Sequence, residues 1–192
     1  MNGIISDLLG YLMQLKQLSS WGSFNSIKDK VHNEIITSWL LEKGPITKRI
    51  KKTGSFQLNL IQDKLSKISI DDKKFINTES KKIKKREVIL LCNDLPIVFA
   101  QTIIPTETIE NGFSELGNLG TKPLGDILFE KDIFVRNSIV FASFTNDSHT
   151  YWGRKAKYSV KGYRFSVMEI FLINENSVLK INIGLFEIKT KK

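Results

Sequence analysis

A glutamate on the apolar face of a predicted strand is the first feature of this sequence that could do chemistry. Across residues 163–173 every second side chain points to the same side of the strand, and Glu169 shares that side with aromatic and aliphatic residues. A carboxylate in such a place is costly to bury unless a partner compensates its charge. A two-residue turn at Lys161-Gly162 would place Arg154 directly opposite Glu169 on the preceding strand. The sequence therefore predicts an Arg154–Glu169 ion pair, which is equally compatible with a structural and a functional role.

Arg86 is the second candidate, because it ends a lysine cluster and begins an apolar run. The lysines, at positions 81, 82, 84 and 85, are expected to precede the strand and to stay in solvent, as most charge clusters do. Arg86 would be the first residue of the strand that follows. Its orientation stays open, because both faces of residues 87–92 are nearly equally apolar.

Two loops could bind an anion through backbone N–H groups. In the segment TKPLG (121–125), Leu124 lies in the first turn of a predicted helix, where N–H groups lack intrahelical acceptors. In the segment GPITKR (44–49), a turn would leave the N–H groups of Ile46 and Thr47 free. The first loop lacks the spacing of a P-loop, so each segment is only a general anion-binding feature.

The surrounding elements predict an α+β fold with an antiparallel sheet. Helical patterns dominate the N-terminal part, with an amphipathic helix over residues 4–15 and a second helix from Ser26 to Glu42. Residues 64–85 are polar and are predicted to be rich in loops. The predicted strands lie at 55–62, 86–92, 95–105, 132–144, 151–160, 163–173 and in the tail 177–192. A short helix after Pro123 interrupts this run of strands. Strands and helices do not alternate regularly, so the helices should cover one face of the sheet, with the hairpin 86–105 at its centre.

The composition limits the class of protein. A length of 192 residues suits one domain over 1–192, and no apolar run reaches the roughly 20 residues that a membrane span needs. The net charge of +9 favours anionic partners, but an excess of Ile, Lys and Asn, as AT-rich genomes impose, explains part of it. The basic region 73–85 holds a single aromatic residue, so nucleic-acid binding is not expected. Cys92 is the sole cysteine, which excludes an intramolecular disulfide and a cysteine-rich metal site.

Several segments together carry a resemblance to a known family. They are WLLEKGPITKRI (39–50), REVILLCNDLPIVFAQTIIP (86–105), LGNLGTKPLGDILF (116–129), YWGRKAKY (151–158) and KGYRFSVMEIFL (161–172). In this order and at this spacing they resemble chorismate lyase, and the resemblance is strongest over residues 39–172. It implies a single compact α+β domain in which an antiparallel sheet, helices and flaps cover an internal ligand pocket.

The resemblance also implies roles for individual residues. Arg86 would bind the aromatic carboxylate and Glu169 would meet the hydroxyl at the other end of the ring, and both would be catalytic. Backbone N–H groups of Ile46 and Leu124 would complete the site, while Arg154 would oppose the charge of Glu169 or bind the enolpyruvyl carboxylate. The protein would be a carbon–oxygen lyase that converts chorismate to 4-hydroxybenzoate and pyruvate for plastoquinone or ubiquinone biosynthesis, with no metal or redox cofactor.

One position departs from the family pattern. Gln101 stands where relatives of the bacterial ubiquinone pathway carry an arginine, so one ligand for a second carboxylate would be missing. The sequence therefore resembles a divergent cyanobacterial or algal-plastid type. A monomer in the chloroplast stroma is expected if the gene is organellar, and a cytoplasmic one otherwise. The alternative is a non-catalytic domain of the same fold that senses small aromatic acids, as in bacterial transcription regulators.

Overall fold

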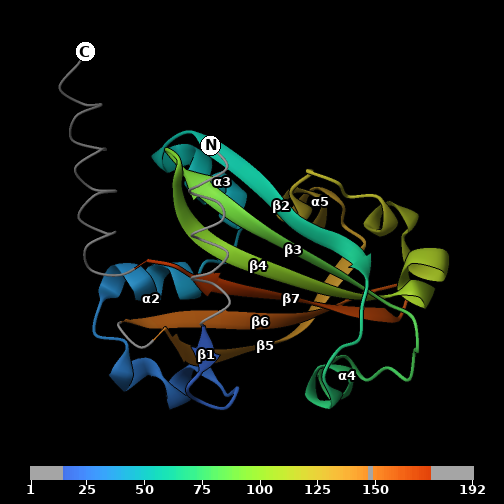
Figure 1. Ribbon diagram of the computed structural model, residues 1–192, viewed down its shortest axis with the longest axis horizontal. Helices are drawn as coiled ribbons and strands as arrows, with labels where there is room; N and C mark the ends of the chain where they lie inside the picture. The colour runs from blue at the N-terminus through green and yellow to red at the C-terminus, as the bar shows by residue number, and fades with distance from the viewer. Residues whose placement is uncertain (1–14, 147–148, 174–192) are drawn as a thin grey trace.

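The computed structural model describes residues 15–146 and 149–173, which form one curled antiparallel sheet with short helices around it (Figure 1). The sheet has seven strands in the order β1-β5-β6-β7-β4-β3-β2. Their bounds are β1 (Lys16–Gln17), β2 (Phe56–Leu65), β3 (Ile83–Cys92), β4 (Leu95–Pro105), β5 (Phe134–Thr145), β6 (Thr150–Val160) and β7 (Tyr163–Phe171). All neighbouring strands run antiparallel, which confirms the predicted α+β class.

Short helices cover both faces of the sheet. They are α2 (Glu34–Leu40), α3 (Ile46–Thr53), α4 (Ile70–Ile76) and α5 (Leu124–Glu130), with 3-10 turns η1 (Phe24–Ser26), η2 (Lys28–Lys30) and η4 (Ser114–Gly117) and a π-turn η3 (Thr108–Gly112). Helices α2, α3 and α5 pack on the face that carries Arg86 and Glu169. Helix α4 packs on the opposite face, where Ile76 lies against Ile83 and Ile103. The prediction that only one face is covered is therefore wrong.

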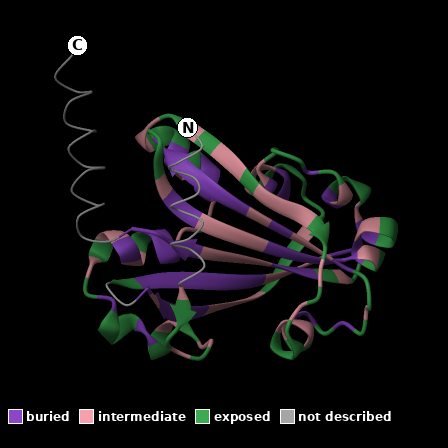
Figure 2. Ribbon diagram, in the orientation of Figure 1, coloured by how far each residue is buried: buried purple, intermediate pink, exposed green. Residues whose placement is uncertain are grey.

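The sheet separates apolar clusters on its two faces, and its middle strands hold most of the buried residues (Figure 2). On one face Trp39 and Ile50 from the helices pack with Leu90 and Phe171 from the strands. On the other face a smaller cluster surrounds Ile170. Because β3, β4, β6 and β7 are buried on both faces, polar side chains that face the interior from these strands need partners of their own.

Both predicted hairpins form with the predicted loops. The backbone angle φ is positive at both residues of the turns 93–94 and 161–162, which is the conformation that two-residue hairpin loops require. The first hairpin is interior in the sheet, as expected. The second pairs Arg154 with Glu169 across β6 and β7, so the register predicted from the turn length is confirmed.

The predicted helix from Ser26 to Glu42 is shorter in the structure. One 3-10 turn ends at Ser26, a second spans Lys28–Lys30, and α2 begins only after Asn33. The Asn33 side chain accepts hydrogen bonds from the N–H groups of Ile35 (2.9 Å) and Ile36 (3.2 Å) while its own backbone is extended. An asparagine in this conformation caps a new helix and cannot continue an earlier one.

The polar region 64–85 contains more structure than predicted. Ser69 caps α4 by accepting from the N–H of Asp72 at 3.0 Å, and β3 already begins at Ile83. Lys84 and Lys85 therefore lie inside the strand instead of before it, and neither is fully exposed. Of the four lysines expected in solvent, only those at positions 81 and 82 are exposed.

Two predicted elements lie mainly outside the residues that the structure describes. The helix over residues 4–15 lies, Leu15 apart, outside the described residues, and so does the strand in the tail after residue 173. Within the described ranges, no helix is long and apolar enough to cross a membrane.

Candidate active site

A pocket lies between the sheet and the first turns of α3 and α5. It encloses about 670 Å³ of atom-free space, part of which is open to solvent. The sheet contributes a mainly apolar floor, and the residues 44–47 and 123–125 form two lids above it. A mainly apolar pocket with a few convergent polar groups is typical of a small-molecule site. The pocket brings together Arg86, Glu169, Arg154, Ile46 and Leu124, all of the site residues predicted from the sequence.

Arg86 supplies an internal positive charge to this pocket. Its side chain is only 2% exposed although it carries a guanidinium. Nη2 donates to the carbonyl oxygens of Gly120 (3.0 Å) and Lys122 (2.9 Å), whereas the buried Nε has no hydrogen-bond partner among the described residues. Burial lowers the pKa of Arg86 and the nearby Asp63 opposes this, but an arginine stays protonated at neutral pH. An unpaired N–H on a buried cation is suited to a carboxylate ligand.

Asp63 and Lys84 form the border of this cation site. Lys84 Nζ lies 3.0 Å from Asp63 Oδ1 without the geometry of a hydrogen bond, so the contact is one of charge. Lys84 also donates to the carbonyl oxygen of Gly117. The loop 117–122 is thus bound by two cations of β3, which hold it beside the pocket.

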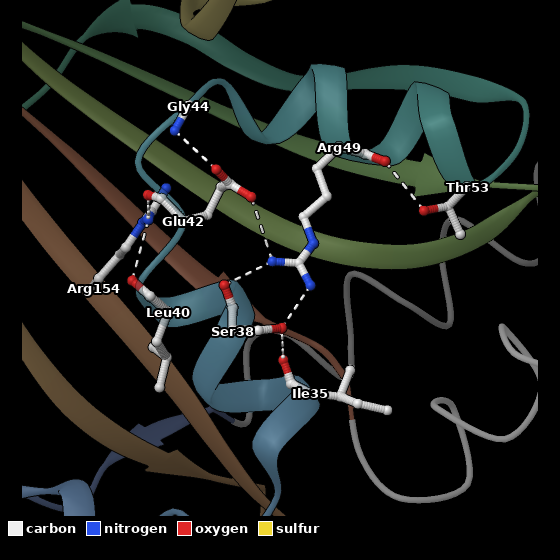
Figure 3. Close-up of polar contacts among 8 residues, drawn as sticks. All are labelled: Ile35, Ser38, Leu40, Glu42, Gly44, Arg49, Thr53 and Arg154. Carbon is white, nitrogen blue, oxygen red and sulfur yellow. Dashed lines mark hydrogen bonds and ion pairs between the residues drawn. The ribbon is translucent and has the colours of Figure 1, made fainter.

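Glu169 is held by Arg154, and Arg154 is held by backbone carbonyls at the end of α2 and just after it. Arg154 Nε donates to Glu169 Oε2 at 2.6 Å. Its Nη1 donates to the carbonyl oxygens of Leu40 (3.1 Å) and Glu42 (2.6 Å), as Figure 3 shows. Arg154 therefore fixes the carboxylate of Glu169 and the segment that connects α2 with α3. The ion pair predicted from strand phase is present, on the face of the sheet that lines the pocket.

Both lids present the N-terminus of a helix to the pocket. Ile46 and Leu124 are the first residues of α3 and α5, and each follows a proline with extended backbone. The N–H groups of a first turn lack intrahelical acceptors and carry the positive end of the helix dipole. The segment 44–49, predicted as a turn, is thus the start of a helix, but its N–H groups remain suited to a polar ligand.

The two lids are joined to each other. Thr47 Oγ1 donates to Asp126 of α5, and Lys51 Nζ lies 3.1 Å from Asp126 Oδ2. Asp126 therefore connects α5 to two successive turns of α3. Opening the pocket by separating α3 and α5 requires these contacts to break.

A second set of contacts fixes residues 41–45, which connect α2 with α3 and enter the first lid (Figure 3). Glu42 Oε1 accepts from the Gly44 N–H at 2.9 Å, and its Oε2 lies 3.5 Å from Arg49 Nη1. Arg49 also donates to the carbonyl and hydroxyl oxygens of Ser38, each at 2.6 Å. Its guanidinium lies 4.1 Å from the ring centroid of Trp39. The backbone N–H groups of the first lid are thus held in place by side chains outside the pocket.

Glu42 is expected to make the free energy of unfolding depend on pH. The Gly44 N–H is the main cause that holds the pKa of Glu42 below its ordinary value of 4.5; burial opposes this and Arg49 adds to it. Because the native pKa lies below the unfolded one, the stabilisation is complete above the unfolded pKa and is lost as the pH falls through the native pKa. Urea unfolding from about pH 7 down to about pH 3 should reveal a shallower loss of stability for Glu42→Gln than for the wild type.

The matched control for this measurement is Glu79→Gln, which removes an exposed carboxylate. Its pH dependence of unfolding should follow that of the wild type. Equal slopes for Glu42→Gln and the wild type would contradict the role given to the Gly44 contact.

Sequence reasoning missed Arg136 and Tyr158, which also line the pocket. They are cross-strand partners on β5 and β6. A β-bulge between Arg136 and Ser138 changes the phase of β5, so that the alternation read from the sequence fails there. No signal in the sequence marks the position of that bulge.

The sequence similarities agree with this geometry. A family model described as chorismate lyase matches residues 18–178. The chain belongs to the chorismate lyase family. Among its relatives is a "Probable chorismate pyruvate-lyase" of Pseudoalteromonas translucida, 28% identical over 148 residues that cover 70% of this chain and 82% of that protein. A chorismate pyruvate-lyase of Pectobacterium atrosepticum is 26% identical over 150 residues, which cover 72% of this chain and 77% of that protein.

A comparison of folds gives a more distant likeness. The crystal structure of PhnF from Mycobacterium smegmatis matches 68% of this chain and 64% of that chain, with a TM-score of 0.50 and 9% sequence identity. At this identity the likeness concerns the fold alone. The relatives from Pseudoalteromonas translucida and Pectobacterium atrosepticum are both bacterial, and they do not test the predicted plastid location.

One expectation about the chorismate lyase pattern is wrong. Gln101 was expected to mark a lost ligand in the site, but it does not line the pocket, whereas its neighbours Ala100 and Thr102 do. Gln101 Nε2 instead donates to Glu87 Oε1 at 2.8 Å. Because successive residues of a strand face opposite sides, a side chain at position 101 points away from the pocket.

Proposed function

We propose that this protein is a chorismate pyruvate-lyase, which converts chorismate to 4-hydroxybenzoate and pyruvate. The observation that carries the proposal is the pairing, in one pocket, of a buried arginine that has an unpaired N–H with a carboxylate fixed by a second arginine. Membership of the chorismate lyase family supports the same activity.

The spacing of Arg86 and Glu169 fits the two ends of the ring. They lie on β3 and β7 with β4 between them, which are two strand spacings of about 4.8 Å each. A six-membered ring with a carboxylate and a hydroxyl at opposite ends can lie between the two side chains. Arg86 would bind the ring carboxylate, Glu169 would accept from the C4 hydroxyl, and the N–H groups of Ile46 and Leu124 would complete the polar contacts.

The reaction is balanced without an external reactant. The bond from ring C3 to the ether oxygen breaks, enolpyruvate leaves and takes up a proton to become pyruvate, and the hydrogen at C4 leaves as a proton. The ring becomes aromatic, so the step is driven by the substrate itself. The protein has to orient the ring, exclude water and receive the C4 proton. Glu169 would serve as the base, because it is the carboxylate among the described residues that line the pocket. Arg154 would act as a positioning residue, because it holds Glu169 against the lid segment.

The experiment is a product assay with the purified protein. Chorismate should yield 4-hydroxybenzoate, followed by chromatography, and pyruvate, followed with lactate dehydrogenase, in equal amounts. The alternative, a domain that senses aromatic acids, predicts binding of 4-hydroxybenzoate without turnover. Calorimetric binding of 4-hydroxybenzoate with no formation of pyruvate would therefore overturn the catalytic proposal.

The wider setting is proposed on the same basis. A product that carries a hydroxyl para to a carboxylate is a ring precursor suited to quinone synthesis, in a plastid or in a bacterial cytoplasm. We also propose that the protein acts as a single domain and as a monomer. Size-exclusion chromatography with light scattering would test the oligomeric state.

Loosening the contact between the lids is expected to speed the release of 4-hydroxybenzoate. Asp126 joins α5 to Thr47 and Lys51 of α3, and lid opening often controls product release. Asp126→Asn should raise the dissociation rate several-fold in a stopped-flow displacement experiment. Glu130→Gln, an exposed change at the far end of α5, should leave that rate unchanged. A wild-type rate for Asp126→Asn would mean that the lids open without breaking this contact.

A further inference from the structure

The proposed substrate carries two carboxylates, and the pocket has one arginine beyond those already engaged. Three arginines line it: Arg86, Arg136 and Arg154. Arg86 is assigned to the ring carboxylate. Arg154 donates from Nε to Glu169 and from Nη1 to two backbone carbonyl oxygens. Arg136 is the arginine left for the second carboxylate.

The β-bulge in β5 is what turns Arg136 toward the pocket. Ile139 pairs with Ala156, and both line the pocket. In a regular strand the residue two positions earlier, Asn137, would face the same way. The bulge leaves Asn137 unpaired and sets Arg136 opposite Tyr158 instead. Bulges often redirect a side chain beside a functional site. This bulge places the guanidinium of Arg136 where a regular strand would place the amide of Asn137.

Tyr158 gives Arg136 a neutral hydrogen-bonding neighbour. The Tyr158 ring stacks on Phe165, with 5.6 Å between the ring centroids and 20° between the planes. Burial raises the pKa of the Tyr158 hydroxyl and the charge of Glu169 raises it further, while the charges of Arg136 and Arg154 partly offset the rise. The phenol therefore stays protonated at neutral pH and is able to donate to an anion.

Arg136 is not neutralised by a carboxylate of the protein. Glu130 and Asp132 line an adjoining hollow with it, yet neither forms an ion pair with Arg136 among the described residues. The side chain is exposed, so its guanidinium can move to a ligand without breaking a salt bridge. Its place at the junction of the two hollows is where a side chain on the ring would leave the enclosed part of the pocket.

We propose that Arg136 and the hydroxyl of Tyr158 bind the enolpyruvyl carboxylate of chorismate. This inference rests on the proposed lyase function and goes beyond it, because it names the residues that distinguish substrate from aromatic product. The second carboxylate leaves with pyruvate, so 4-hydroxybenzoate lacks the group that Arg136 would bind. The subsite thus adds affinity for the dianion and adds none for the retained product.

The test compares ligands and variants in one design. The two probes are 3-(carboxymethoxy)-4-hydroxybenzoate, which keeps a carboxylate on the ring side chain, and its side-chain methyl ester, which does not. Arg136→Gln should weaken binding of the dianion about tenfold or more, as expected for a lost charge-assisted hydrogen bond, and should leave binding of the ester unchanged. Arg136→Lys should restore part of the loss, and Tyr158→Phe, which keeps the ring, should lose a few-fold.

Kinetics provide the second readout. With chorismate, Arg136→Gln should raise KM by a similar factor while kcat and the affinity for 4-hydroxybenzoate stay within about twofold of the wild type. Arg164→Gln is the matched control, because Arg164 is exposed on β7 next in sequence to Phe165 and on the opposite face. An equal loss in Arg164→Gln would indicate general electrostatic attraction and would overturn the subsite.

The outcomes separate this proposal from the proposed function. If the wild type forms no pyruvate from chorismate, the lyase function fails, whatever the variants do. If the wild type is active but Arg136→Gln binds the dianion and the ester in the wild-type ratio, the subsite fails and the lyase function stands. A change in that ratio confined to Arg136 and Tyr158 variants supports the subsite.

Discussion

Replacement of Arg86 by glutamine is expected to reduce kcat/KM for chorismate by about 10³-fold, because truncating a buried charge partner of a ligand typically costs 2–5 kcal/mol. Arg86 is the only buried arginine of the pocket whose Nε has no hydrogen-bond partner among the described residues. A neutral side chain would leave the ring carboxylate in a desolvated pocket without a counter-charge. Product assays at several chorismate concentrations measure the change, and calorimetry with 4-hydroxybenzoate should detect a comparable loss of affinity.

A structural explanation has to be separated from a loss of binding, since Arg86 also donates to the carbonyl oxygens of Gly120 and Lys122. Arg86→Lys keeps the charge but not the planar fork, and it should retain more binding than Arg86→Gln and less than the wild type. 4-Hydroxybenzyl alcohol, which lacks the carboxylate, should bind Arg86→Gln and the wild type equally. If the alcohol were weakened as much as 4-hydroxybenzoate, the pocket itself would be distorted and the assignment of Arg86 to the carboxylate would fail.

The case of Arg86 shows where sequence reasoning stops in this fold. Strand phase did not orient it, because β3 is buried on both faces and lacks a polar side. The resemblance to chorismate lyase assigned it to the pocket, which is where the structure has it. Interior strands of a covered sheet lose the alternation that makes one face recognisable, so phase is informative only where a charged residue interrupts an apolar face.

Glu169 was such an interruption, and its partner was predictable for a specific reason. A two-residue loop fixes the register of a hairpin, and the side-chain period of a strand is two, so the position opposite Glu169 follows from the turn alone. The same reasoning cannot be carried across β5, because a bulge adds a residue to one strand and shifts the phase beyond it. The sequence therefore predicted the position of Arg154 opposite Glu169, but it did not predict that Arg136 lines the pocket.

The lids were predictable only in part. Pro123 indicated a helix start, whereas the segment around Pro45 was predicted as a turn. Nothing in the sequence indicated that Asp126 would join the two segments across 75 or more positions. Contacts of this kind depend on how the sheet curls and on which loops it brings together. They are tertiary properties, and local patterns carry little information about them.

The second large effect is expected for Arg154→Met, which should lower the free energy of unfolding by about 3–5 kcal/mol, the usual cost of removing one partner of a buried ion pair. The side chains of Arg154 and Glu169 are only 7% and 17% exposed, so Glu169 would be left as a largely buried charge. The carbonyl oxygens of Leu40 and Glu42 would also lose their donor. Chemical denaturation of the variant and the wild type at pH 7 measures the difference.

The double variant Arg154→Met/Glu169→Met separates the two contributions. Removing both charges abolishes the buried unpaired carboxylate, so the double variant should be more stable than Arg154→Met. It should remain less stable than the wild type, because the carbonyl oxygens of Leu40 and Glu42 stay without the Arg154 donor, at about 1–3 kcal/mol each. A double variant no more stable than Arg154→Met would contradict the view that the charge of Glu169 depends on Arg154.

Lys155→Met is the matched control for the functional side of this argument. Lys155 is also buried and paired, with Asp72 of α4, but it lies on the face of the sheet away from the pocket. Its loss should lower stability and leave kcat/KM of the folded protein near the wild-type value, whereas Arg154→Met should lower both, because the carboxylate and the lid lose their common anchor. If Lys155→Met and Arg154→Met lowered kcat/KM equally, Arg154 would contribute only stability. A loss confined to Arg154→Met would mean that one guanidinium couples the position of the Glu169 carboxylate to the segment that connects α2 with α3.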